Sequence, residues 1–188
     1  ITKPIGELPL LTSSIITLIK RLSAQYAAHP FDLIRSAAPP RIAAVEREFE
    51  GLKFGEARIG KNSSAEFLQL PPSKNRAFLI AHKVAEAGAK GGVIAILPDS
   101  REVARVAEQL NSLGMRFTTL DSELPRSKAY RNFLLLRSGE ISIAVGTRSA
   151  VFAPVQNLNS ILIYNDGAET FYERRSPGWN VRSVAQER

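Results

Sequence analysis

A short run of small, hydroxyl and cationic residues follows an apolar stretch in the second half of the chain. It reads Gly146-Thr147-Arg148-Ser149 and comes directly after residues 141–145. A glycine, two hydroxyls and an arginine can together hold a phosphate oxygen through backbone N–H, hydroxyl and guanidinium donors. The run is equally compatible with a turn that begins at Gly146 and leaves Arg148 in a surface ion pair. The residues alone leave both interpretations open.

A second polar position follows another apolar stretch, residues 161–164. Asn165 and Asp166 stand there, where nucleotide hydrolases place an aspartate to hold magnesium and a glutamate to orient the attacking water. A single carboxylate followed by Gly167 and Ala168 cannot serve both purposes, so the favoured interpretation of Asp166 is a turn former. The sequence also lacks a G-x-x-x-x-G-K-[ST] run, which would present backbone N–H groups to nucleotide phosphates.

The composition excludes several classes of site. The 188 residues contain no cysteine and two histidines, which excludes a disulfide scaffold, a cysteine nucleophile and a thiolate zinc site within this span. We expect no metal ligands here. The net charge of +7 favours a polyanionic partner such as nucleic acid. That charge is spread along the chain without a basic tail, so a solvated positive surface is an equal alternative.

Neither a membrane segment nor a leader is expected. No apolar run approaches the ~20 residues that cross a bilayer, and no basic-then-apolar leader is visible. The default compartment is therefore the cytoplasm. Because the chain begins at Ile1 and ends at Arg188 in a polar stretch, we expect it to be a fragment of a longer protein.

The N-terminal part of the chain is predicted to be helical. Residues 10–28 have the spacing of an amphipathic helix capped by Thr12, and residues 31–37 that of a second, short helix. Two short helices around a turn are compatible with a helix-turn-helix or winged-helix element, although most such pairs are packing units. Residues 46–73 show no sustained period of either kind and are predicted to be a linker.

From residue 74 onward the pattern alternates between helices and strands. Strands are expected at four apolar stretches, residues 93–97, 116–120, 141–145 and 160–164. Consecutive apolar residues in strands separated by helices are typical of a parallel sheet with both faces covered. The fold class is therefore α/β, and ligands are expected at the carboxyl ends of the strands, where both polar runs stand.

The first polar run also carries a family resemblance. Residues 143–154 read I-A-V-G-T-R-S-A-V-F-A-P, with Asn157 and Leu158 following. This stretch resembles the motif Ib region of the PriA family of bacterial replication-restart proteins, also called primosomal protein N′. Three further stretches resemble the family in order and spacing: residues 10–40, 96–99 and 161–172.

The departures from the family concern its nucleotide site. Members read G-x-x-G-x-G-K-T where this chain has residues 68–75, so Lys74 stands at the lysine position, prolines remove N–H donors and Asn75 replaces the magnesium-binding hydroxyl. The family's D-E-E-H box is reduced to Asn165-Asp166-Gly167-Ala168. Lys74 and Asp166 would thus form a degenerate nucleotide site, which argues against ATP as a cofactor. The resemblance is to the actinobacterial branch, which keeps the fold but lacks helicase motifs.

The resemblance implies a domain organisation and a function. Residues 1–45 would end a winged-helix DNA-binding region, residues 46–73 would be a linker, and residues 74–188 would be a degenerate, RecA-like first lobe of a superfamily-2 helicase. The protein would recognise forked or single-stranded DNA in the replication-restart primosome and recruit replisome-loading partners, without helicase activity or a catalytic residue. An active ATP-dependent 3′-to-5′ helicase using Lys74 and Asp166 is one alternative, and a protein-interaction scaffold is another.

The DNA-binding hypothesis names candidate contact residues. Thr147, Arg148 and Ser149 are expected to bind backbone phosphates. Weaker electrostatic contributions are expected from Lys74, Arg76, Arg126 and Lys128. No cofactor is expected within this span, and family members carry a cysteine-ligated zinc module in a part of the protein beyond it.

Overall fold

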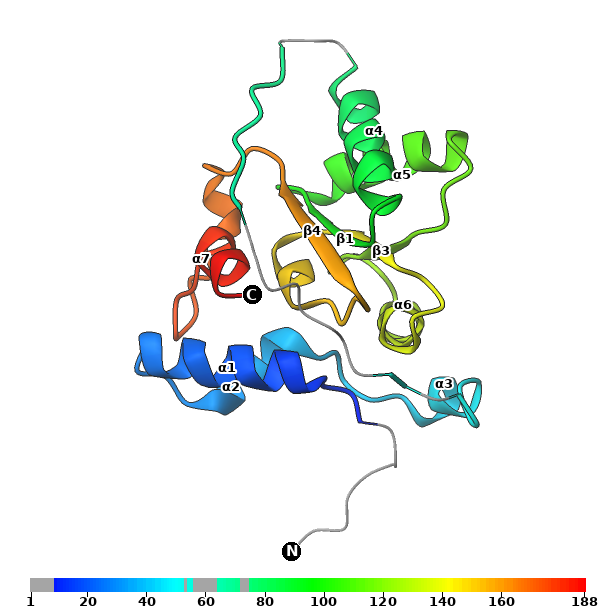
Figure 1. Ribbon diagram of the computed structural model, residues 1–188. Helices are drawn as coiled ribbons and strands as arrows, with labels where there is room; N and C mark the ends of the chain where they lie inside the picture. The colour runs from blue at the N-terminus through cyan, green and yellow to red at the C-terminus, as the bar shows by residue number, and fades with distance from the viewer. Residues whose placement is uncertain (1–8, 53, 56–63, 72–74) are drawn as a thin grey trace, which may run out of the picture.

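The structure is a computed structural model that describes residues 9–52, 54–55, 64–71 and 75–188. Its centre is one parallel sheet with the strand order β2-β3-β1-β4 (Figure 1). The strands are β1 (Gly92–Ile96), β2 (Thr118–Leu120), β3 (Ile143–Gly146) and β4 (Leu158–Ile163). Each lies within a few residues of a stretch predicted from consecutive apolar residues.

Helices surround this sheet. In chain order they are α1 (Ser13–Gln25), α2 (Pro30–Ala37), α3 (Ala43–Arg47), α4 (Arg76–Gly88), α5 (Ser100–Ser112), α6 (Arg126–Ser138), the 3-10 helices η1 (Arg148–Phe152) and η2 (Glu169–Phe171), and α7 (Val181–Glu187). The α/β fold with a parallel sheet flanked by helices is therefore confirmed. The RecA-like assignment stays a prediction.

The central strand β1 divides the core into two layers. Because side chains alternate along a strand, Val93 and Ala95 face one side of the sheet while Ile94 and Ile96 face the other. The first pair lies in a buried cluster with apolar residues of α4 and α5. The second pair lies in a cluster with residues of α1, α2, η1 and α7. Figure 1 shows these two groups of helices on opposite sides of the sheet.

The N-terminal helices form as the sequence predicts. The Thr12 hydroxyl accepts a hydrogen bond from the Ile15 amide at 3.2 Å and so caps α1. The His29 Nδ1 atom accepts from the Phe31 amide at 3.2 Å and caps α2. The buried face of α1 belongs to the same cluster as Ile94 and Ile96. The helices thus pack on the sheet, while the division of the chain at residues 45 and 73 stays a prediction.

The start of the predicted linker is structured. Helix α3 ends at Arg47, and Val45 and Phe49 are 2% and 4% exposed. They pack against Tyr130 and Phe133 of α6. A helix of five residues is too short to produce a recognisable period, which is why the spacing did not reveal it. Within the described residues, no helix is both long and apolar enough to span a membrane.

Candidate functional site

A cleft of about 830 Å³ lies at the carboxyl ends of β1, β2 and β3. Pro98, Leu120 and Thr147 line it, and each closely follows or ends one of these strands. Residues 35–40, at the end of α2 and just beyond it, also line the cleft. The cleft therefore lies where an open parallel sheet binds its ligands.

Close packing fixes the start of the Gly146–Thr147 turn. A Cβ atom on Gly146 would stand 2.2 Å from the Leu120 carbonyl oxygen and 2.8 Å from Cβ of Ala150. The Thr147 amide donates to the same Leu120 oxygen at 3.1 Å. The helix η1 then begins, and its residues Ala150, Val151 and Phe152 are buried. The turn is thus held between β2 and η1.

The two hydroxyls of the run are available for a ligand. Thr147 is half-buried, Ser149 is exposed, and both line the cleft. Neither hydroxyl hydrogen-bonds to another group in the part of the chain that the structure describes. Each can therefore donate to a phosphate oxygen without first giving up an internal partner.

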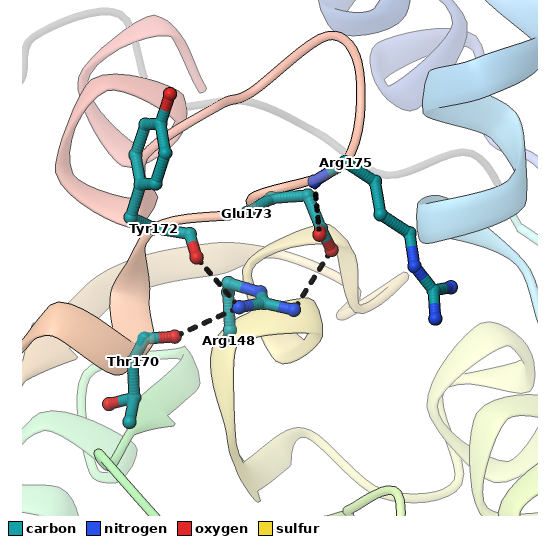
Figure 2. Close-up of polar contacts among 5 residues, drawn as sticks. All are labelled: Arg148, Thr170, Tyr172, Glu173 and Arg175. Carbon is teal, nitrogen blue, oxygen red and sulfur yellow. Dashed lines mark hydrogen bonds and ion pairs between the residues drawn. The ribbon is translucent and has the colours of Figure 1, made fainter.

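Three protein oxygen atoms hold the half-buried guanidinium of Arg148 (Figure 2). Its Nη1 donates to the Thr170 carbonyl oxygen at 3.1 Å and to the Tyr172 carbonyl oxygen at 2.8 Å. Its Nη2 donates to Oε2 of Glu173 at 2.8 Å. Both sequence interpretations remain compatible with this geometry, because Arg148 forms an ion pair and still lines the cleft.

The Trp179 ring packs against the Arg148 guanidinium, a contact that the sequence did not indicate. The Arg148 Cζ atom lies 5.8 Å from the centroid of the Trp179 ring, within range of a cation–π interaction. The ring is 1% exposed and meets Phe152 edge to face, with centroids 5.1 Å apart. The Trp179 carbonyl oxygen accepts from the Glu173 amide at 2.8 Å. Trp179 thus braces both partners of the ion pair.

Three further arginines face the cleft from separate elements: Arg35 of α2, Arg101 of α5 and Arg175 of the segment after η2. None of their guanidiniums has a hydrogen bond or ion pair with the described residues. Sequence reasoning missed all three because they converge only through the fold.

Most of the carboxylates in the cleft lining are bonded internally. Asp99 accepts from the Glu102 amide at 2.9 Å, which caps α5. Asp121 accepts from the Ser100 hydroxyl at 2.9 Å and from the Glu123 amide at 3.0 Å. Glu173 is paired with Arg148. Glu173 is the one lining carboxylate that pairs with a cation among the described residues, so the cleft contains unpaired carboxylates as well as unpaired guanidiniums. An anionic ligand would be bound by the guanidiniums and the hydroxyls.

Three of the four weaker electrostatic contributors named from the sequence are described, and all three lie outside the cleft lining. Arg126 and Lys128 are exposed on the first turn of α6. Arg76 is exposed at the start of α4, and its Nη1 donates to the Tyr164 hydroxyl at 3.3 Å. These three cations can add to the field around the protein, and their contact with DNA stays a prediction.

The described residues of the degenerate nucleotide site form hydrogen bonds within the protein. Lys74 lies outside the described residues. The Asp166 carboxylate accepts a hydrogen bond from the Arg182 guanidinium of α7. The Asn75 Oδ1 atom accepts from the Phe78 amide at 3.2 Å and caps α4. No group of three histidine or carboxylate side chains among the described residues could hold a metal ion.

Comparison with known proteins supports the resemblance seen in the motifs. No family model matches the chain. It is 28% identical to the probable replication restart protein PriA of Mycobacterium tuberculosis over 96% of this chain and 31% of that protein. It is 27% identical to the probable replication restart protein PriA of Mycobacterium leprae over 96% of this chain and 32% of that protein.

Another bacterial relative matches only part of the chain. The replication restart protein PriA of Thermotoga maritima is 32% identical over 52% of this chain and 14% of that protein. The chain thus spans about a third of the length of the mycobacterial relatives. The family resemblance predicted from residues 143–154 is confirmed.

Proposed function

The chain is PriA-like along nearly its whole length, and from that premise we propose that it acts in replication restart by binding DNA through the cleft. The observation that carries the proposal is the set of free donors there. The hydroxyls of Thr147 and Ser149 share the cleft with the unpaired guanidiniums of Arg35, Arg101 and Arg175. Several cations and hydroxyls along one open cleft suit the phosphates of a nucleic-acid backbone.

The cleft is suited to the DNA backbone more than to the bases. Its aromatic lining residues, Phe133 and Trp179, are 3% and 1% exposed, so their faces are not open for base stacking. Binding through phosphates alone does not depend on base sequence. This mode of binding would let the protein bind forked or single-stranded DNA of any sequence at a stalled replication site. Recruitment of other primosome proteins belongs to the same proposal.

We propose further that this protein does not unwind DNA with ATP. Asp166 is engaged by Arg182, and Asn75, at the position of the magnesium-binding hydroxyl, caps α4 instead. Phosphate release from ATP, measured with and without forked DNA, tests this. We expect no stimulation by DNA. A DNA-stimulated rate that is lost in Lys74→Ala would establish the helicase alternative.

Fluorescence anisotropy of labelled single-stranded and forked oligonucleotides tests DNA binding by the full chain. The variant Arg35→Gln/Arg175→Gln removes two cations from the cleft. The matched control Arg105→Gln/Arg116→Gln removes two exposed cations that do not line it. Both variants have the same net charge, so a difference between them reports position.

We expect the wild-type affinity to fall with salt, because bound phosphates release counterions. The cleft variant should weaken binding about tenfold and reduce the slope of log K against log salt by about 1.4, because each lost single-strand contact removes about 0.7. The control should change the affinity by less than about twofold. Equal losses in both variants, or no binding by the wild type, would contradict the proposal.

A further inference from the structure

Glu173 occupies the place on Arg148 that an external anion would take. The Glu173 Oε2 atom lies 2.8 Å from Nη2 of Arg148, and its Oε1 atom accepts from the Arg175 amide at 3.0 Å. The side chains of Arg148 and Glu173 are 32% and 18% exposed. Carboxylate and phosphate oxygens accept from a guanidinium in the same way. The ion pair is therefore an internal copy of the contact that Arg148 would make with DNA.

The other contacts of Arg148 keep it in position when that carboxylate leaves. Nη1 remains bonded to the carbonyl oxygens of Thr170 and Tyr172, and the Trp179 ring stays beneath the guanidinium. Only the bond from Nη2 has to be exchanged. The guanidinium is thus already oriented for an incoming phosphate, which lowers the entropic cost of binding.

Arg175 is placed to receive a phosphate beside the exchanged pair. Its amide holds Glu173, while its side chain extends away from the Arg148–Glu173 pair (Figure 2). The guanidinium of Arg175 is unpaired among the described residues and lines the cleft. A polyanion can engage Arg175 first and then compete with Glu173 for Arg148.

We propose that Glu173 is an internal competitor that DNA phosphates displace from Arg148, an inference that rests on the proposed DNA-binding function. A ligand must then displace the Glu173 carboxylate before it can bind Arg148. A ligand with several phosphates does so, because it engages Arg35, Arg101 and Arg175 at the same time. A single phosphate lacks these additional contacts and leaves the Arg148–Glu173 pair intact.

The variant Glu173→Gln tests this competition in the full chain. Glutamine keeps an oxygen that can accept from the Arg175 amide but removes the charge that competes with phosphate. The matched control is Glu169→Gln, which removes the same charge from a side chain that is 93% exposed and 4.0 Å from Arg174. Anisotropy of a labelled single strand at fixed salt gives the affinity of each variant.

We expect Glu173→Gln to bind the strand about three- to tenfold more tightly than the wild type, since a charge-assisted contact with Arg148 is freed. Glu169→Gln should gain less than about twofold, because salt screens its exposed charge. In a protein that also carries Arg148→Gln, the substitution Glu173→Gln should no longer increase the DNA affinity. A double-mutant cycle gives this result when the two residues interact directly. Equal gains at positions 173 and 169, or a gain that persists without Arg148, would overturn the inference.

A measurement on the wild type covers the case in which Glu173→Gln fails to fold. Trp179 is the only tryptophan of the chain, and the Arg148 guanidinium, which Glu173 pairs with, lies over its ring. Displacement of the carboxylate changes the charge beside the indole, so its emission should shift when the single strand binds. Inorganic phosphate at the same ionic strength should produce no shift. Unchanged emission on a strand that anisotropy shows to be bound would refute the exchange.

The two proposals fail in distinguishable ways. A wild-type chain that does not bind DNA removes the proposed function and the inference together. If the wild type binds, and Arg35→Gln/Arg175→Gln weakens binding while Glu173→Gln matches Glu169→Gln, the proposed function stands and the competition by Glu173 is wrong.

Discussion

Gly146 at the end of β3 touches Leu120 at the end of β2 so closely that it leaves no room for a side chain. The first atom of any side chain at Gly146 would lie 2.2 Å from the Leu120 carbonyl oxygen. That same oxygen accepts the Thr147 amide. The contact therefore determines both the spacing of two strand ends and the direction in which the run Gly146–Ser149 leaves the sheet.

The variant Gly146→Ala is expected to separate these strand ends. Because the obstructing atoms are backbone and a buried Ala150 methyl group, the free energy of unfolding should fall by about 1–3 kcal/mol. DNA affinity should fall as well, since Thr147 and Ser149 move. Urea denaturation and oligonucleotide anisotropy measure the two effects. Gly167→Ala is the control, because a Cβ there meets no atom within 4 Å; equal stability of the two variants would contradict the steric argument.

The local sequence pattern was sufficient to predict the strands and the helix ends that depend on neighbouring residues. Consecutive apolar residues located all four strands, and the hydroxyl of Thr12 located the start of α1. Gly139 ends α6 in a left-handed conformation with φ of 81°, a common role of glycine after a helix. A cleft does lie at the carboxyl ends of the strands, where a parallel sheet is expected to bind ligands, and ligand binding there stays a prediction.

The rest depended on contacts between distant segments. Glu173 is 25 residues from its partner Arg148, and no spacing rule connects them. Arg35 and Arg101 reach the cleft from different helices. Trp179 follows Pro177 and Gly178, two residue types that favour a turn, yet its ring is buried beside Arg148. Such convergence is a property of the tertiary structure and cannot be predicted from local periodicity.

A polar network between α3 and α6 makes stability depend on pH. Arg41 donates to Glu46 through Nε at 2.7 Å and Nη2 at 2.9 Å, and the Tyr130 hydroxyl donates to the same carboxylate. The hydrogen bonds from Arg41 hold the pKa of Glu46 below its usual range. Burial raises the pKa of Tyr130, so its hydroxyl stays protonated as a donor.

We therefore expect Glu46→Gln to flatten the acid side of the stability profile. Because the pKa of Glu46 is lowered on folding, its contribution is present above the unfolded pKa of about 4.3 and is lost as pH falls through the folded pKa. The wild type should lose stability more steeply than the variant as pH decreases below about 5. Urea denaturation between neutral and acid pH measures both slopes. Parallel profiles would show that the network does not contribute.

Buried Arg137 is expected to hold two segments that precede the sheet in sequence. Its side chain is 1% exposed, and it donates through Nε to the Pro9 carbonyl oxygen at 3.1 Å and through Nη1 to that of Gly55 at 2.6 Å. Arg137→Met keeps the apolar stem but removes the donor to both oxygens, and among the described residues the Gly55 oxygen then keeps only the bond from Nε2 of Gln156 at 3.2 Å. The free energy of unfolding should fall by about 3 kcal/mol.

Arg131→Met on the same helix is the control for Arg137. Arg131 pairs with Glu48 at the surface, so its loss should destabilise the protein much less. Urea denaturation gives the stability of both variants. Similar losses for the two arginines would show that the buried contacts of Arg137 are not special.

Substitutions of Trp179 should separate stability from DNA binding. The Nε1 atom of Trp179 is buried without a hydrogen-bond partner in the described residues, so Trp179→Phe loses no hydrogen bond. Phenylalanine keeps an aromatic face under Arg148 and an edge for Phe152, but its smaller ring should reduce the free energy of unfolding by about 1–2 kcal/mol. We expect its DNA affinity to stay within about twofold of the wild type, since the cation–π contact is retained.

Trp179→Leu removes the aromatic face altogether. Arg148 then keeps its bonds to Thr170, Tyr172 and Glu173 but loses the surface that restrains the guanidinium plane. DNA affinity should therefore fall by about two- to fivefold, the equivalent of a cation–π contact of about 0.5–1 kcal/mol. Fluorescence anisotropy compares the DNA affinities of the two variants. It is measured at a temperature at which urea denaturation shows both variants to be folded. If leucine and phenylalanine bind DNA equally well, Trp179 acts only as a core residue, and Arg148 is oriented by its two carbonyl partners alone.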